Sequence, residues 1–370
     1  MEGDRLYYVS NRCVVNCLDT EGFANGNQGD QNEQYKTETD ADVIWSFDMM
    51  KELNVSPHNL AACSPLIVGD ILFVITANGV DEQHISIPSP EAPSFIALDK
   101  KTGKLLWKDN SPGKQIMHGQ WSNPTYAEIG GVPQVIFPGG DGWMRGFETK
   151  SGKLIWKFDA NPKDSFYELG SKGTKSDFIA TPVAHDGKIY FSTGQDPEHN
   201  PGVGHFWCID PTGKTGDLSP ELVTDNSVKP PKTKPNPNSG VVWHFGGVDS
   251  DPNAKREIIF YRTMSTASVH DGLVYVADLD GYMYCLDAKT GKVYWIHDTK
   301  SEIWGSTYWV DGKVYLCVGD GDVYIFAHGK EKKLLTKIDM DEAIRSTPVV
   351  VNGVLYIMTE NNLYAIQGKK

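Results

Sequence analysis

The sequence has 370 residues, of which 39% are hydrophobic and 22% are charged, so the chain is long enough to bury a large apolar core. Its net charge of −13 opposes binding to nucleic acid, because phosphate groups repel an acidic surface. No run of about 18 apolar residues occurs, so we expect no membrane-spanning segment.

The first predicted unit, residues 4–48, consists of alternating apolar strands interrupted by a polar insertion. Its sequence motif begins at Cys17, is split by residues 20–42, and ends at Trp45. We expect the insertion to be flexible decoration of a turn. Cys13 lies four positions before Cys17, and a local disulfide between them stays an open alternative.

The next two units, residues 64–110 and 122–160, carry an eleven-residue motif without gaps. Ala-Leu-Asp-Lys-Lys-Thr-Gly-Lys-Leu-Leu-Trp ends at Trp107, and Gly-Phe-Glu-Thr-Lys-Ser-Gly-Lys-Leu-Ile-Trp ends at Trp156. The Gly-Lys pair after Thr or Ser is typical of a tight turn, with the preceding acidic side chain accepting backbone hydrogen bonds. The large indole needs a buried place, which we predict in the seam between neighbouring sheets.

The fourth unit, residues 180–247, contains a split copy of the same motif from Cys208 to Trp243. The inserted residues 211–240 are polar and rich in Pro and Lys near their end, so we expect flexible decoration here too. Cys208 occupies the position of Ala97 in the second unit, which indicates a small apolar core residue rather than a reactive thiol. Cys285 is interpreted in the same way.

The last three units repeat with a spacing of about 40 residues, the size of a four-stranded propeller blade. They span residues 265–299, 306–340 and 346–367. The fifth unit ends its motif at Trp295, whereas the sixth has no tryptophan at this place. Asp-Gly and Asn-Gly pairs between alternating apolar runs predict hairpins. We therefore predict an all-β fold, a β-propeller of four-stranded antiparallel blades with seven repeat units in one domain over residues 1–370.

The pattern Ala-x-Asp-x-x-Thr-Gly-Lys-x-x-Trp resembles the tryptophan-docking motif of PQQ-like (pyrroloquinoline quinone-like) propeller repeats. The resemblance covers the chain from about residue 4 to its end. Proteins of this family include quinoprotein dehydrogenases, the propeller lipoprotein of the outer-membrane β-barrel assembly machinery, and many proteins without assigned activity. The resemblance implies a periplasmic or secreted location; the first residues show no signal-peptide pattern.

The two ends of the chain each show an incomplete unit. The first unit lacks its inner strand and the last lacks its outer strand, so the two partial units do not complete each other. We expect a parent protein with eight blades, of which this chain is a shortened form.

Polar and aromatic residues precede several inner strands, where a propeller has its central funnel. The candidates for cofactor binding are His118, Trp121, Asp177, Arg262, Trp304 and Arg345. Arginine and indole groups around one axis suit a flat anionic ligand through bidentate hydrogen bonds and stacking. PQQ, a planar tricarboxylate, is such a ligand, and a water-filled polar funnel mouth is the alternative.

Insertions at residues 79–94 and 194–205 interrupt second-to-third strand turns, on the face that also carries the blade-to-blade connections. We call this the loop-rich face, and loops held on a rigid frame often carry function. The two insertions contain Asp81-Glu82-Gln83-His84 and Asp196-Pro197-Glu198-His199. Imidazole and carboxylate ligands suit a divalent metal, so His84, Glu198 and His199 are the metal candidates. Two similar polar loops without a metal are the alternative interpretation.

We favour a non-catalytic, monomeric propeller that binds a protein or an extracellular ligand on the loop-rich face, and we name no catalytic residue. The alternative is a PQQ-dependent quinoprotein oxidoreductase of the alcohol or sugar dehydrogenase type, with calcium beside the quinone. The resemblance implies that such enzymes stack the quinone against a disulfide between adjacent cysteines. None of the six cysteines here are adjacent, which favours the binding role.

Overall fold

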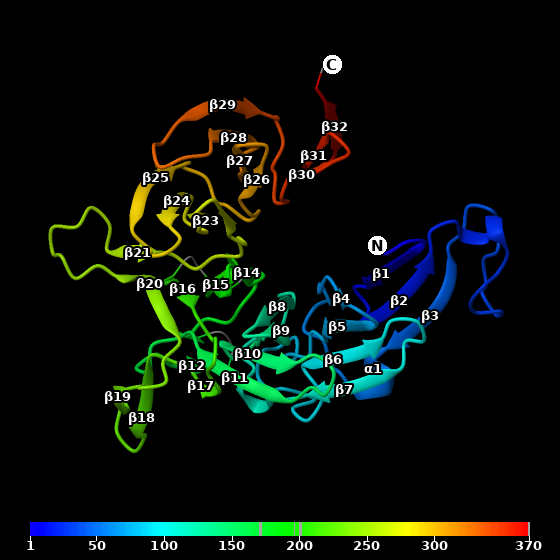
Figure 1. Cartoon of the computed structure of the whole chain (residues 1–370), viewed down its shortest axis with the longest axis horizontal. Coiled ribbons are helices and arrows are strands. Elements are labelled where there is room, and N and C mark those ends of the chain that lie inside the picture. Colours follow the sequence, from blue (N-terminus) through cyan, green and yellow to red (C-terminus); the bar gives the residue numbers. More distant parts are fainter. Residues whose placement is uncertain (170–171, 196, 200–201, 369–370) are drawn as a thin grey trace. The chain divides into compact units, whose positions relative to one another are not determined.

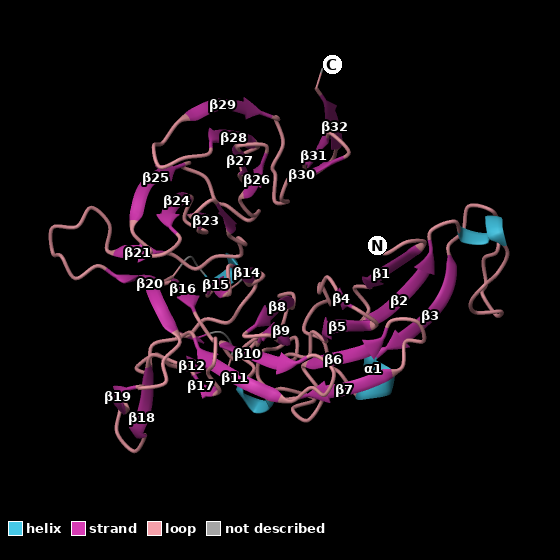
Figure 2. Cartoon of the chain, in the orientation of Figure 1, coloured by secondary structure: helices cyan, strands magenta, loops and turns pink. Residues whose placement is uncertain are grey.

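The computed structural model describes residues 1–169, 172–195, 197–199 and 202–368. Strands dominate this part of the chain, and its helices are single short segments (Figure 2). They are α1 (Met49–Leu53) and the 3₁₀ segments η1 (Gly22–Asn25), η2 (Gly113–Gln115) and η3 (Pro197–His199). None of these described helices has the length and apolarity needed to cross a bilayer. The predicted all-β fold class is confirmed.

Seven antiparallel blade sheets follow one another along the chain, as the seven repeat units predict (Figure 1). Contacts divide the chain into two compact units, each larger than a repeat unit and called the first unit and the second unit below. The first unit consists of Met1–Phe158 with Phe166–Gly173, and the second of Asp159–Ser165 with Thr174–Lys370. Both units are built from propeller blades, and their union in a single domain stays a prediction.

The first unit holds the first three blade sheets, which match the predicted units closely. The three-stranded first sheet orders β1 (Arg5–Val9), β2 (Val14–Asp19) and β3 (Asp42–Asp48). The second orders β4 (Leu66–Val68), β5 (Ile71–Ile75), β6 (Phe95–Asp99) and β7 (Leu105–Asp109). The third runs through β8 (Thr125–Ile129), β9 (Val132–Pro138), β10 (Trp143–Glu148) and β11 (Leu154–Asp159). A small hairpin joins β12 (Tyr167–Glu168) to β13 (Lys172–Gly173).

The second unit holds the other four blade sheets. The fourth orders β14 (Val183–His185), β15 (Lys188–Ser192), β16 (His205–Ile209), β20 (Val241–Val248) and β21 (Ile258–Phe260). The fifth orders β22 (Ser268–His270), β23 (Leu273–Ala277), β24 (Tyr282–Asp287) and β25 (Val293–Asp298). The sixth orders β26 (Tyr308–Val310), β27 (Lys313–Cys317), β28 (Asp322–Ala327) and β29 (Leu334–Asp339). The seventh has three strands, β30 (Val349–Val351), β31 (Val354–Met358) and β32 (Leu363–Gln367).

The repeated tryptophans pack against the next sheet along the chain, as the motif predicts. The Trp45 indole N–H donates to the carbonyl of Lys100, 3.0 Å away in the turn of the next sheet. A Cβ atom on Gly103 of that turn would lie 2.6 Å from the Trp45 ring, so only glycine allows this close approach. The same ring-to-glycine contact joins Trp107 to Gly152 and Trp243 to Gly291.

A small residue faces each of these indoles across the neighbouring strand. Cys17 is opposite Trp45, Ala97 opposite Trp107, Cys208 opposite Trp243 and Cys285 opposite Trp295. A register shift directly follows each of these pairs, so a bulge accommodates the ring. The interpretation of Cys208 and Cys285 as buried core residues is confirmed.

Trp156 departs from this arrangement. Its indole N–H donates to the side-chain oxygen of Gln134, 2.8 Å away on the same sheet. The ring has no exposed surface and lies where a side chain on Gly146 would otherwise be. This indole therefore stabilises its own sheet from within.

The segments on either side of β20 are more ordered than the sequence predicts. The insertion 211–240 forms the short strand β17 (Gly216–Asp217) and a hairpin of β18 (Glu221–Asp225) with β19 (Lys232–Pro235). Buried Asn236 stabilises the base of this hairpin, since the Asn236 side-chain amide donates to the carbonyl of Ser219 at 2.8 Å. The expectation of flexible decoration is wrong here because local hydrogen bonds replace the missing apolar periodicity. Strand β21 is also an addition, and it pairs with the end of β20.

Candidate functional site

Three histidines from three different loops converge in the first unit. His58 follows α1, His84 lies between β5 and β6, and His118 follows η2. Their ring centroids are 4.3 Å (His58–His118), 4.7 Å (His58–His84) and 4.8 Å (His84–His118) apart. One nitrogen of each ring lies within 4.8 Å of those of the other two. We call these residues the histidine triad, and they are all the histidines that the first unit contains.

Hydrogen bonds orient the triad. Nδ1 of His58 lies 3.1 Å from the Val80 carbonyl, which accepts only if this nitrogen carries the proton. The lone pair of His58 is then on Nε2. Nε2 of His84 and Nε2 of His118 face each other at 2.8 Å. At this distance one ring donates to the other, so at least one of these nitrogens is protonated.

The loop 79–94 reaches the triad because of a glycine. The Val80 amide donates to the His118 carbonyl at 3.1 Å, and the Gly79 amide donates to the Ser56 carbonyl at 2.9 Å. A Cβ atom on Gly79 would lie 2.6 Å from the His118 carbonyl oxygen and 2.7 Å from Cβ of His58. Any other residue here would push the three loop segments apart.

A compact turn presents His84 to the other two rings. The Asp81 carboxylate accepts from the Ile85 amide at 2.8 Å and from the Ser86 hydroxyl at 2.5 Å. These hydrogen bonds, the Ser86 hydroxyl first, lower the pKa of Asp81 and keep it ionised. His84 has a positive φ of 58°, which this turn supports. The acidic residue of the predicted metal motif is therefore a structural acceptor that holds the histidine in place.

The Trp121 ring packs beside the triad. Its ring is 5.1 Å from that of His118 in an edge-to-face arrangement and 5.9 Å from that of His58. Its indole N–H donates to the Leu60 carbonyl at 3.1 Å, which fixes the ring. Two of the predicted funnel residues, His118 and Trp121, thus lie in contact.

Arg262 in the second unit holds loops together. Its guanidinium donates to the Ser176 hydroxyl at 2.9 Å, the His199 carbonyl at 3.1 Å and the Lys175 carbonyl at 3.3 Å. The neighbouring Asp177 bridges to the loop at Gly194, whose amide donates to the Asp177 carbonyl at 3.0 Å. The sequence predicts Arg262 as a ligand for carboxylates, but these donors point to protein oxygens.

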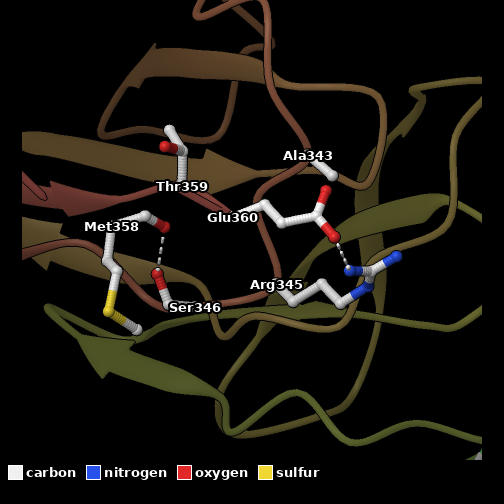
Figure 3. Close-up of a pocket in the computed structure, with 6 residues that line it drawn as sticks. All are labelled: Ala343, Arg345, Ser346, Met358, Thr359 and Glu360. Atoms are coloured by element: carbon white, nitrogen blue, oxygen red, sulfur yellow. Dashed lines mark hydrogen bonds and ion pairs between the residues drawn. The ribbon is translucent and has the colours of Figure 1, made fainter. Parts of the chain in front are cut away.

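Trp304 and Arg345 come together at a second place in this unit. The Arg345 guanidinium lies 5.2 Å from the centre of the Trp304 ring, and its Nη1 is 3.8 Å from Oε1 of Glu360. Arg345 and Glu360 line an open pocket of about 330 Å³ (Figure 3). The other lining residues are Ala343, Ser346, Met358 and Thr359. The carboxylate of Glu360 offsets the charge of the arginine, so this pocket offers little attraction for an anion.

The six cysteines are all free and buried. Burial raises the pKa of Cys13, Cys63, Cys208, Cys285 and Cys317 to about 12 and also raises that of Cys17. These thiols stay protonated at neutral pH and are poor nucleophiles. Because the Arg262 donors already point to protein oxygens, this residue does not fit a carboxylate of PQQ as a quinoprotein dehydrogenase would hold it.

The metal candidates divide between the two units. His84 belongs to the triad, whereas Glu198 and His199 lie on η3 of the second unit, and Asp196 lies outside the described residues. A shared site of His84 with Glu198 and His199 stays a prediction. The sequence argument missed that His58 and His118 join His84. The available signal was that every histidine of the first unit falls in a loop between strands.

Comparisons with known proteins agree with the fold. A family model described as "Outer membrane protein assembly factor BamB" matches residues 25–214 and 235–369. The crystal structure of BamB from Moraxella catarrhalis aligns with a TM-score of 0.60 at 15% identity, covering 100% of this chain and 80% of that one. Sqt1 from Saccharomyces cerevisiae aligns with a TM-score of 0.57 at 8% identity, covering 99% and 81%. These structures show the fold alone.

Enzymes are among the relatives in sequence. The chain is 26% identical to the tetrathionate hydrolase of Acidithiobacillus ferrooxidans over 338 residues, 80% of this chain and 62% of the relative. It is 28% identical to the dehydrogenase subunit of the quinone alcohol dehydrogenase of Gluconobacter oxydans, over 54% of this chain and 29% of the relative. The chain spans less than two thirds of the length of these relatives.

Proposed function

Because the chain belongs to the family of the outer membrane protein assembly factor BamB, we propose that it is a non-catalytic propeller that binds a protein or another extracellular ligand. The binding surface in this proposal is the loop-rich face, with loop 79–94 at its centre. We place the protein in the periplasm or outside the cell, on the ground of the family alone.

The observation that carries this proposal is an exposed apolar residue at the tip of an ordered loop. The Ile85 side chain is 74% exposed, directly after His84 and inside the turn that Asp81 closes. At the base of the loop, the Asn78 side chain donates to the Ser89 carbonyl at 2.9 Å and joins the two ends of the loop. A rigid loop with an apolar tip loses little conformational entropy on binding, which favours a role in recognition.

Substitution of Ile85 tests this surface. Burying such a side chain in an interface contributes about 1.5–3 kcal/mol, so Ile85→Ser should weaken binding at least about tenfold. The tagged full chain is used to capture proteins from the extracytoplasmic fraction of its host, and bound proteins are quantified by mass spectrometry. Leu106→Ser is the matched control, since Leu106 is 48% exposed on outer strand β7. A partner retained equally by all three chains would move the interface elsewhere.

A quinoprotein oxidoreductase is the second candidate function, because a quinone alcohol dehydrogenase is among the relatives. The test is retention of quinone absorbance after gel filtration of the chain with PQQ and calcium, followed by dye-linked oxidation of alcohols and sugars. Retention together with turnover would replace the binding proposal. We expect neither, because Arg262, which would hold a quinone carboxylate, already donates to protein oxygens.

A further inference from the structure

We propose that the histidine triad of the first unit, His58, His84 and His118, is a binding site for a divalent transition metal such as Zn²⁺. His84 lies on loop 79–94, which also carries the proposed partner-binding surface, but metal binding needs no partner and is measured on this chain alone. It differs from the sequence-based metal prediction in two of its three ligands.

The donor atoms select the class of metal. The triad offers three imidazole nitrogens, a ligand set that suits zinc, copper, nickel and iron. Calcium and magnesium need oxygen ligands, and the triad provides no carboxylate. The nearby carboxylate of Asp81 is occupied by the Ile85 amide and the Ser86 hydroxyl.

The geometry is close to that of a three-histidine site. Nitrogens bound to one tetrahedral Zn²⁺ at about 2.0–2.1 Å are roughly 3.3 Å apart. The triad nitrogens lie within 4.8 Å of one another, so the rings need to move by only about one ångström. His84 sits on a loop and is half-buried, whereas His58 and His118 are buried. His84 is therefore the ligand that closes the site.

The surroundings of the triad resemble those of metal sites in proteins. Metal-binding histidines usually donate their second ring nitrogen to a carbonyl or carboxylate, which fixes the ring. The Val80 carbonyl has this relation to Nδ1 of His58 at 3.1 Å. The Trp121 ring covers one side and excludes water there. Three protein ligands leave a fourth position for water or an incoming ligand, on the side of the half-buried His84.

Metal titration of the chelator-treated full chain tests the proposal. Co²⁺ should produce visible absorption bands that saturate at one ion per chain, and Zn²⁺ should displace it. His84→Ala should weaken Zn²⁺ binding by more than the roughly 10- to 100-fold that loss of an outer partner costs. His185→Ala is the control, because His185 lies on β14 outside the triad. Circular dichroism and the thermal midpoint verify that both variants fold.

Spectroscopy on the unmodified chain provides a second test that no folding defect can affect. With one equivalent of Cu²⁺, electron paramagnetic resonance should show coupling to three nitrogen nuclei. The absence of saturable binding below about 100 µM metal would overturn the proposal. Binding that His84→Ala leaves unchanged would overturn it as well.

Discussion

Two of the close groups of imidazole rings in the described part of the chain differ in a way that shows what makes a ligand site. In the second unit His205 on β16 and His244 on β20 are diagonal neighbours, because His205 is opposite Gly246 and His244 is opposite Trp207. Their rings are 5.2 Å apart and near-parallel at 29°. Nδ1 of His205 and Nε2 of His244 are 3.0 Å apart, and the Trp207 ring lies 4.0 Å from His244. The paired strands hold the rings in this stacked arrangement, and one hydrogen bond links them.

The histidine triad has a different origin. Its rings come from three loops and are tilted by 34°, 47° and 59° relative to one another. One nitrogen of each ring lies within 4.8 Å of those of the other two. A loop-built group of rings therefore concentrates three nitrogens at one point, whereas the strand-built pair brings together only two.

The largest effect is expected from Gly79→Ala, which removes the space in which the triad forms. The new methyl group would overlap the His118 carbonyl and Cβ of His58, and such overpacking costs about 3 kcal/mol. Denaturant unfolding measures this loss. Gly131→Ala is the control, since its Cβ meets no atom within 4 Å and only its positive φ of 77° is unfavourable, at about 1 kcal/mol. Equal losses in the two variants would show that the close approach at Gly79 is not needed.

Metal should stabilise only one of the two groups. At a free Zn²⁺ concentration 100 times the dissociation constant, the folded state should gain about 2.7 kcal/mol. Hydrogen–deuterium exchange should show the added protection in peptides that contain His58, His84 and His118. Peptides that contain His205 and His244 serve as the internal control. Protection that is equal in both places would contradict the distinction between the two groups.

A third prediction concerns pH and the strand-built pair. Burial, with a smaller contribution from His244, lowers the pKa of His205 to about 3, whereas an unfolded histidine titrates near 6.5. Below about pH 6.5 the unfolded chain binds a proton that the folded chain does not, so the free energy of unfolding falls as the pH decreases. Between pH 7 and pH 5 the loss due to His205 should be about 2 kcal/mol.

The matched variant for this pH series is His205→Asn, in which that part of the slope should disappear. His185→Asn on β14 is the control for loss of a histidine outside this pair. Chemical unfolding at half-unit pH intervals measures all three chains. Identical slopes would mean that His205 is protonated in the folded state.

Most of the fold could be predicted because its signals are local. Alternating apolar residues, Asp-Gly turns and the tryptophan motif each act within a dozen residues, and they gave all seven units. The missed elements have no such signal. The hairpin of β18 and β19 depends on hydrogen bonds such as that of Asn236, and β21 is a run of three apolar residues after a polar loop. Trp156 carries the motif, yet its donor bond stays within its own sheet.

The candidate site was harder to predict because it depends on the paths of loops. His84 was recognised from its polar loop, but the sequence pairs it with Glu198 and His199 through a shared motif. Its contacts with His58 and His118 arise from a close approach at Gly79, which no local pattern reveals. Arg262 was recognised as important, but its role in holding loops depends on oxygens of Lys175, Ser176 and His199 that meet only in the folded chain.

The contact of Trp45 with Gly103, repeated by Trp107 with Gly152, has a consequence for synthesis on the ribosome. Each indole finds its partner in a segment that is translated later. A nascent chain therefore exposes each of these indoles until the turn that contacts it emerges, and the two sheets of each pair become joined only then. A pause in translation just after one of these tryptophans would leave an apolar ring in water for its whole duration.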